Sequence, residues 1–293
     1  MSKDTTPEVA VSSEGTAASA HQFTSTYGYS VAGQGIYRRR TQSENRWWPI
    51  VGGAILPLLV LIIWWAVTEF TDVPPYRLPS PADVVNAAVD LAASGQLYRD
   101  IAISTQRVVQ GFALGSLIGI VIGSLIGLSK NASILLSPTI GALRAVPSLA
   151  WVPLLVLYVG IGEPPKVILI TIGAAFPVLT TLSIALRHVD RNLVELGRAY
   201  GLKPIGLLAA VQLPAVLPAL VSGLRLALAQ SWLFLVAAEL LSSSMGLGFL
   251  LIDSGNNGRV DRIFLAIIVL AILGKATDAL IGLLEKWLNR RWG

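Results

Sequence analysis

Charged residues make up only 13 % of this chain, whereas soluble domains carry roughly 25 %. So few charges cannot cover the surface of an ordinary globular protein of 293 residues, and the mean hydropathy of +0.66 agrees. Apolar runs of about 18 or more residues predict membrane-spanning helices, because a helix satisfies its own backbone hydrogen bonds in hydrocarbon. The chain has several such runs, so we expect an all-α, polytopic membrane protein.

Cysteine is absent, which excludes disulfides, thiolate metal sites and a cysteine nucleophile. Both histidines, His21 and His188, lie outside the predicted spans, so no Ser–His pair for an intramembrane enzyme is available. No GxxxxGK[ST] phosphate-binding loop is present, since Gly274 and Lys275 are followed by Ala276 and lack the upstream glycine. We therefore expect no catalytic residue, metal or cofactor in this chain.

The pattern divides the chain into four parts. Residues 1–45 are rich in Ser, Thr, Gly and Ala without periodicity, and are expected to form a disordered cytoplasmic tail. A first transmembrane helix falls in 46–75, and an external amphipathic helix, capped by Ser80, falls in 76–100. The remainder, 101–290, is expected to form a five-helix core. The six expected spans are 48–70, 104–128, 133–160, 165–186, 213–240 and 263–285.

The second span carries glycines at steps of four, at positions 111, 115, 119, 123 and 127. Such a ridge on one helix face lets a neighbouring backbone approach closely. We expect it to pack inside one subunit, with a subunit interface as the alternative.

Lysine and arginine near span ends predict orientation, because cytoplasmic loops carry the excess. With the N-terminus inside, twelve basic residues fall on the cytoplasmic side: Arg38, Arg39, Arg40, Arg46, Lys130, Arg187, Arg191, Arg198, Lys203, Lys286, Arg290 and Arg291. Five fall outside: Arg77, Arg99, Lys166, Arg259 and Arg262. Both termini are therefore expected in the cytoplasm. The basic residues form no continuous patch, so nucleic acid is not an expected partner.

A polar segment, "VELGRAYGLKPIGLLAAVQLP" at 194–214, separates two of the longest apolar runs. It resembles the cytoplasmic signature of ABC importer permeases, written EAA, three residues, G, nine residues, I, one residue, LP. Glu195, Gly201 and Pro214 match, whereas Leu196 replaces Ala and Val211 replaces Ile. The resemblance runs from about 78 to 292, and "RAVPSLAWVPLLVLYVGIGE" and "LGKATDALIGLLEKW" look most like the aliphatic sulfonate permeases of the nitrate, taurine and sulfonate family.

This resemblance implies a type I ABC importer permease fold in the inner membrane. It implies two copies of a cytoplasmic ABC ATPase that hold ATP and Mg, a second copy of the permease, and an external solute-binding protein. The implied substrate is a small organic anion, an aliphatic sulfonate, with taurine, nitrate or another small solute as alternatives. An ion-gradient-driven secondary transporter is the competing class, but no internal repeat is evident.

The resemblance also implies that a helix at about 191–204 couples the permease to the ATPase. Its small residues would allow close docking, and prolines at 204 and 214 bound the segment. An interfacial helix lying on the bilayer is the alternative, disfavoured because glycine interrupts the apolar face. The expected coupling residues are Glu195, Gly197, Arg198, Ala199, Tyr200, Gly201 and Leu202.

Ionisable residues inside spans are candidates for a functional site. We identify five as candidates for the translocation pathway: Arg144, Arg225, Glu239, Lys275 and Asp278. Structural pairing of Asp278 with Arg225 or Lys275 is the favoured alternative, because an unpaired buried charge is costly. Arg144 lies near the inner face and can snorkel. Glu239 precedes "SSSMGLGFLL", whose glycines suit a tight re-entrant turn at an outer gate.

Overall fold

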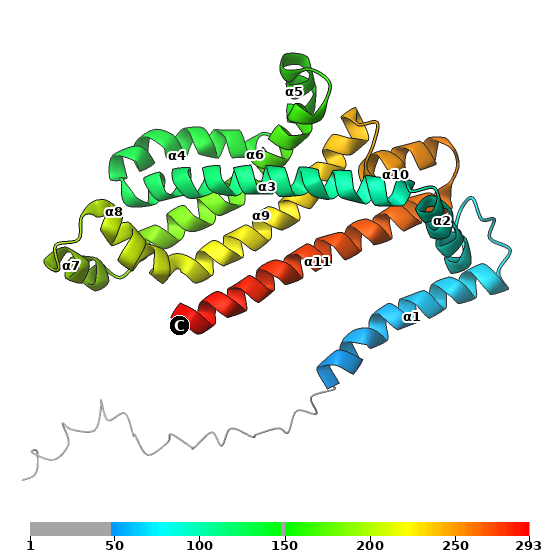
Figure 1. Ribbon diagram of the computed structural model, residues 1–293, viewed down its shortest axis with the longest axis horizontal. Coiled ribbons are helices and arrows are strands. Elements are labelled where there is room, and N and C mark those ends of the chain that lie inside the picture. The colour runs from blue at the N-terminus through cyan, green and yellow to red at the C-terminus, as the bar shows by residue number, and fades with distance from the viewer. Residues whose placement is uncertain (1–47, 148–149, 293) are drawn as a thin grey trace, which may run out of the picture. The chain divides into compact units, whose positions relative to one another are not determined.

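A computed structural model of the chain describes residues 48–147 and 150–292, and every regular element within these ranges is a helix (Figure 1). The expected tail at 1–45 lies outside the described residues. The chain divides into two units, 1–58 and 59–293. Helix α1, Trp48–Phe70, crosses this boundary. In the second unit, Trp64 of α1 stacks on Phe264 with ring centroids 5.4 Å apart.

Four helical segments in the described part of the chain are long and apolar enough to span a membrane: Gln96–Leu128, Glu163–Arg187, Pro204–Leu241 and Val260–Leu288. A shorter apolar helix covers Ile55–Phe70. These segments agree with five of the six expected spans, and helix α1, Trp48–Phe70, has the bounds predicted for the first.

The expected span at 133–160 is not one continuous helix. The structure has α4, Lys130–Ala145, and α5, Trp151–Val159. Between them Val146 is extended, with ψ of 124°, because the residue before a proline is driven out of the helical region, and Pro147 follows. The prediction of an uninterrupted helix was therefore wrong here.

Helices α3, Gln96–Leu128, and α6, Glu163–Arg187, pack along most of their length. All five glycines of the ridge on α3 face α6. A Cβ on Gly119 would lie 2.7 Å from the carbonyl oxygen of Ala175 and 2.8 Å from the Cβ of Val178. No side chain fits between such close backbones, so the ridge packs inside one subunit, as expected.

Helix α9, Leu213–Ser242, packs against both α6 and α3. The shared core contains Val178 and Leu182 of α6 and Leu220 and Ala227 of α9, all of them buried. These apolar side chains fix the relative positions of the two helices. Helices α3, α6 and α9 therefore share a packed apolar core.

The helix that we expected at 76–100 is α2, Pro81–Ala93, and Ser80 caps it as predicted. The Ser80 hydroxyl accepts from the Asp83 backbone N–H, and the Asp83 carboxylate accepts from the Ser80 N–H, which forms a capping box. Gly95, with φ of 75°, separates α2 from α3, so the expected range 76–100 includes the first residues of α3.

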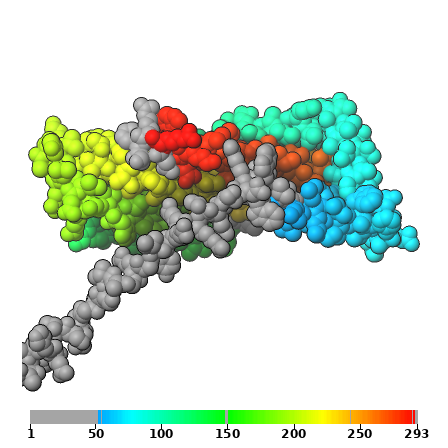
Figure 2. Space-filling view, turned by 90° about the horizontal axis from the view of Figure 1, so that it is seen from below, coloured from blue at the N-terminus to red at the C-terminus, as the bar shows by residue number. Residues whose placement is uncertain are grey.

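Two groups of short elements lie at opposite ends of α6 and α9 (Figures 1 and 2). One group comprises α7, Arg191–Ala199, α8, Pro204–Leu207, and a π-helical turn, Leu208–Gln212. The other contains α10, Leu247–Asn256, after which α11, Val260–Trp292, runs back. We call these the α7 end and the α10 end.

Candidate functional site

Helix α7 is a short helix with a defined start and stop. Asp190 caps its first turn by accepting from the Asn192 backbone N–H at 2.9 Å. Gly201 ends it in the left-handed region, with φ of 76°. The Leu202 N–H donates to the Gly197 carbonyl at 3.1 Å, and the Gly201 N–H to that of Arg198 at 2.9 Å. This is the Schellman arrangement, which gives α7 a fixed end.

The two glycines of the expected coupling segment have different roles. Gly197 is buried, and a Cβ on it would lie 2.5 Å from Cδ1 of Leu207. Because Gly197 lacks a side chain, α7 packs directly on α8 of the same chain. We had expected this glycine to leave room for a partner protein instead. Gly201 has no atom within 4 Å of its Cβ position, so its role is the turn itself.

The outer face of α7 carries an apolar stripe that the sequence analysis missed. Leu193, Leu196 and Tyr200 recur at helical spacing and are 45 %, 55 % and 81 % exposed. Glu195 and Arg198 are exposed beside the stripe. Ala199 is also exposed and Leu202 is half-buried. An exposed apolar stripe on a rigidly held helix is typical of a protein–protein contact.

A buried ion cluster lies at the α10 end, around Arg107. Its side chain is 4 % exposed and donates to Glu239 at 2.6 Å and to the Met245 carbonyl at 2.8 Å. It also forms two hydrogen bonds, of 2.6 and 2.5 Å, with Glu163. Lys166 contacts the same carboxylate at 3.1 Å. These contacts join α3, α6, α9 and the turn before α10.

Glu239, expected on the translocation pathway, is completely buried. Its carboxylate accepts from the Ser104 hydroxyl at 2.8 Å and the Gly248 N–H at 2.7 Å, besides Arg107. A Cβ on Gly248 would lie 2.6 Å from that of Glu239, so glycine is needed where the turn meets this side chain. Glu239 holds the turn to α9 and has no exposed surface for a solute.

The sequence analysis also missed Arg107, although the rule that identified Glu239 applies to it. Arg107 lies within the expected span 104–128, and an ionisable residue there is a candidate. The sequence did not predict which carboxylates pair with Arg107, because Glu163 and Glu239 are 56 and 132 positions away along the chain.

Three other pathway candidates meet on α9 and α11. Arg225 forms a bidentate pair with Asp278, at 2.9 and 3.0 Å, and contacts Glu285 at 3.3 Å. Lys275 lies 3.6 Å from Asp278 on the same helix. Both expected pairings of Asp278 therefore occur together. The cluster contains two cations and two carboxylates, so its charges balance.

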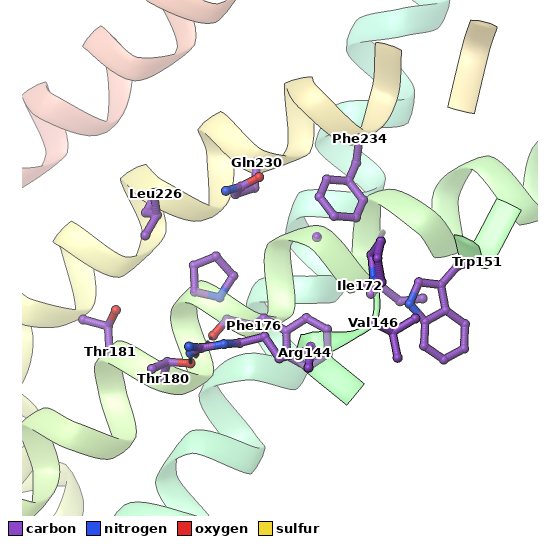
Figure 3. Close-up of a pocket in the computed structure, with 14 residues that line it drawn as sticks. Arg144, Val146, Trp151, Ile172, Phe176, Thr180, Thr181, Leu226, Gln230 and Phe234 are labelled. Atoms are coloured by element: carbon purple, nitrogen blue, oxygen red, sulfur yellow. Dashed lines mark hydrogen bonds between the residues drawn. The ribbon is translucent and has the colours of Figure 1, made fainter. Parts of the chain in front are cut away.

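Arg144 lies apart from these clusters, in a cavity of about 420 Å³ between α4, α5, α6 and α9 (Figure 3). Its guanidinium donates to the Thr180 hydroxyl at 3.3 Å. Within the described residues it has no carboxylate within 4.0 Å, in contrast to Arg107 and Arg225. No group of His, Cys, Asp or Glu among the described residues could hold a metal ion.

Comparisons with known proteins show the family of the chain. The family of binding-protein-dependent transport system inner membrane components matches residues 115–290. The chain belongs to this permease family. Proteins named aliphatic sulfonates transport permease SsuC are 38 % identical in Bacillus subtilis and 39 % identical in Escherichia coli. The alignments cover 81 % and 85 % of this chain, and 87 % and 94 % of those proteins.

The taurine transport system permease TauC of Escherichia coli is 31 % identical, over 77 % of this chain and 86 % of that protein. The inward-facing MetNI methionine ABC transporter shares the fold, with a TM-score of 0.58 at 22 % identity over 68 % of this chain and 96 % of that one. The permease thus has the type I importer fold and is a multi-pass inner-membrane protein. Its relatives are transport permeases and not enzymes, and in ABC importers a separate ATPase subunit uses ATP.

Proposed function

We propose that this permease imports an aliphatic sulfonate, handed over by an external solute-binding protein and released into the cytoplasm. Two relatives at 38 % and 39 % identity carry sulfonate names, which supports this substrate over taurine, nitrate or bicarbonate. Two copies of the permease would form the pathway, and two ATPases would drive it. The coupling helix is α7 with the turn that follows it.

The exposed stripe of Leu193, Leu196 and Tyr200 is the observation that carries the coupling role. A protein partner that covers it removes apolar surface from water, which is favourable. The Schellman turn and the seat of Gly197 on Leu207 hold α7 to the α6–α9 connection, so force on α7 is transmitted to both helices. Glu195 and Arg198 border the stripe and can pair with charges on the ATPase.

Replacing Tyr200 by alanine tests the coupling role, because a side chain that is 81 % exposed contributes little to the fold of the isolated subunit. Aromatic anchors in interfaces cost about 2 kcal/mol or more when truncated, which is roughly a 30-fold loss of affinity. Tyr98→Ala is the matched control, since Tyr98 is 67 % exposed near the α10 end. Binding of the purified ATPase to permease in nanodiscs is the measurement. Equal affinities for both variants would show that α7 instead lies on the bilayer.

The α7 end is proposed to be cytoplasmic, as the excess of basic residues predicts. The chain contains no cysteine, so single cysteines can be introduced without further changes. Asn192→Cys places a thiol on α7, and Asn257→Cys places one between α10 and α11. A membrane-impermeant maleimide added to intact spheroplasts should label only Asn257→Cys. Labelling of Asn192→Cys alone would reverse the orientation.

Uptake into proteoliposomes tests the substrate. The permease, its ATPase and the binding protein should accumulate pentanesulfonate only when ATP is present on the ATPase side. Taurine, nitrate and bicarbonate serve as the alternative substrates. Accumulation that follows an ion gradient without ATP would instead support a secondary transporter.

A further inference from the structure

The cavity around Arg144 has the composition of a small-molecule site. Its volume of about 420 Å³ falls within the range of roughly 300–1,000 Å³ that is usual for such pockets. One wall is aromatic: Trp151, Phe176 and Phe234. The guanidinium of Arg144 lies beside Thr180, away from Trp151 and Phe234 (Figure 3). An apolar wall with one cationic corner suits a ligand that has an apolar part and one negative charge.

Several hydrogen-bond donors that line the cavity have no acceptor among the described residues. A guanidinium has five N–H donors, and the structure gives Arg144 one partner, the Thr180 hydroxyl. The amide of half-buried Gln230 also lines the cavity and has no hydrogen-bond partner within the described part of the chain. A sulfonate oxygen is a strong acceptor and carries charge, so it matches these spare donors.

The cavity lies well inside the apolar length of the helices. At about 1.5 Å per residue, Thr180 is roughly 10 Å from Arg187 and 26 Å from Glu163 along α6. Gln230 is roughly 18 Å from Ser242 along α9 by the same measure. Apolar helix surfaces surround the cavity at this depth, and a cation beside low-dielectric walls attracts an anion more strongly than in bulk water.

The packing of α9 against α6 beside the cavity requires one glycine. A Cβ on Gly173 would lie 2.7 Å from the ring of Phe234, so glycine lets this ring lie directly on α6. The aromatic wall is therefore built into the packing of α6 against α9.

We propose that this cavity binds the organic anion on its way through the membrane. Arg144 holds the sulfonate. The Thr180 hydroxyl, which donates to the Phe176 carbonyl at 2.8 Å and accepts from Arg144, orients the guanidinium. Gln230 donates to the sulfonate, and the aromatic wall packs the alkyl chain. The proposal rests on the proposed import of sulfonates and adds a selection step that does not depend on the binding protein.

The charge of the cavity predicts which anions it accepts. The fourteen described residues that line it include one cation and no carboxylate. A zwitterion such as taurine would bring an ammonium group that loses water and finds no opposite charge. Nitrate would use Arg144 but leave the aromatic wall uncovered. An alkanesulfonate should therefore bind more tightly than either.

ATP-driven uptake of pentanesulfonate by reconstituted permease, ATPase and binding protein tests the role of Arg144. Loss of hydrogen bonds to a charged group should lower uptake by Arg144→Gln at least about tenfold. Thr180→Val should also lower it, and Arg144→Lys should restore part of the loss. Lys130→Gln removes one positive charge from the opposite end of α4 and should transport normally. In Lys130→Gln the loaded binding protein should also stimulate ATP hydrolysis as in the wild type.

The outcomes separate this proposal from the proposed function. If wild-type permease shows no ATP-driven sulfonate uptake, the proposed import of sulfonates fails. If the wild type transports and Arg144→Gln stays within twofold of it, the site is wrong and the importer stands. An effect of Arg144→Gln that appears with phosphatidylglycerol but not with phosphatidylcholine would identify a lipid site and overturn the proposal.

Binding can also be measured without transport. Trp151 lines the cavity, so pentanesulfonate should change tryptophan fluorescence of the permease–ATPase complex in nanodiscs in a saturable way. Trp151→Phe should abolish the change, and Arg144→Gln should raise the half-saturating concentration at least about tenfold. Taurine should give no saturable change at the same concentrations. Equal affinities for pentanesulfonate and taurine would contradict the proposal.

Discussion

The pair of Arg107 and Glu239 provides a test of how the α10 end is held together. The two side chains are 4 % and 0 % exposed, and 2.6 Å separates their charged atoms. In Arg107→Met, Glu239 keeps the Ser104 hydroxyl and the Gly248 N–H but loses its cation. Removing one member of a buried pair typically costs about 3 to 5 kcal/mol, because the other charge is left without compensation. We expect Arg107→Met to lower the free energy of unfolding by this amount.

The second carboxylate on Arg107 should matter much less, although its contacts are equally short. Glu163 is 59 % exposed, and water screens an exposed pair to about 0 to 1 kcal/mol. Lys166 and Arg107 both lose a carboxylate in Glu163→Gln, but the glutamine amide oxygen can still accept from them and Arg107 keeps Glu239. Glu163→Gln should therefore cost less than Arg107→Met. The burial of each carboxylate, and not its distance from Arg107, therefore determines how much its ion pair contributes to stability.

The double variant Arg107→Met with Glu239→Gln removes both charges and leaves an amide oxygen to accept from Ser104 and Gly248. It should be more stable than Arg107→Met alone. The assay is unfolding of purified permease in mixed micelles by increasing SDS, with Arg77→Met as an exposed control. If Glu163→Gln is as costly as Arg107→Met, or if the double variant is no more stable than the single, the reasoning from burial is refuted.

Other packing predictions follow the same logic. Gly119→Leu should lower stability by about 1 to 3 kcal/mol or more through collision with α6, while Gly141→Leu, with no atom within 4 Å of its Cβ position, should be nearly neutral in the same unfolding assay. Arg225→Gln and Asp278→Asn should each change the thermal midpoint in detergent only slightly, because the two side chains are 42 % and 31 % exposed; a stable double variant without uptake would favour a pathway role. Ser80→Ala should cost about 1 kcal/mol through loss of the α2 cap, measurable as faster amide hydrogen exchange in α2, and unchanged exchange would contradict the capping argument.

Local patterns along the chain were enough to predict most of the helices. A run of apolar residues specifies a spanning helix by itself, since its backbone hydrogen bonds are internal. The glycine steps specified a close helix contact, and Ser80 with Pro81 specified the start of α2. The match at Glu195, Gly201 and Pro214 identified the permease family. The break before α5 was missed, although Val146 and Pro147 are the local cause.

The candidate site was predicted only in part, because contacts between distant residues depend on helix packing. The sequence identified Glu239 and Arg144 as charged residues within apolar runs. The sequence pattern alone does not distinguish a charge that is paired in the folded protein from one that is not. Packing of α3 against α6 and α9 places Arg107 beside Glu239, so that the positive charge of Arg107 compensates the negative charge of Glu239 inside the protein. The same packing leaves Arg144 beside Thr180 in an open cavity without a carboxylate. Sequence alone thus determined which residues are charged within the membrane, and only the tertiary structure decided which charges are paired, because pairing requires two helices to place their side chains within a few ångströms.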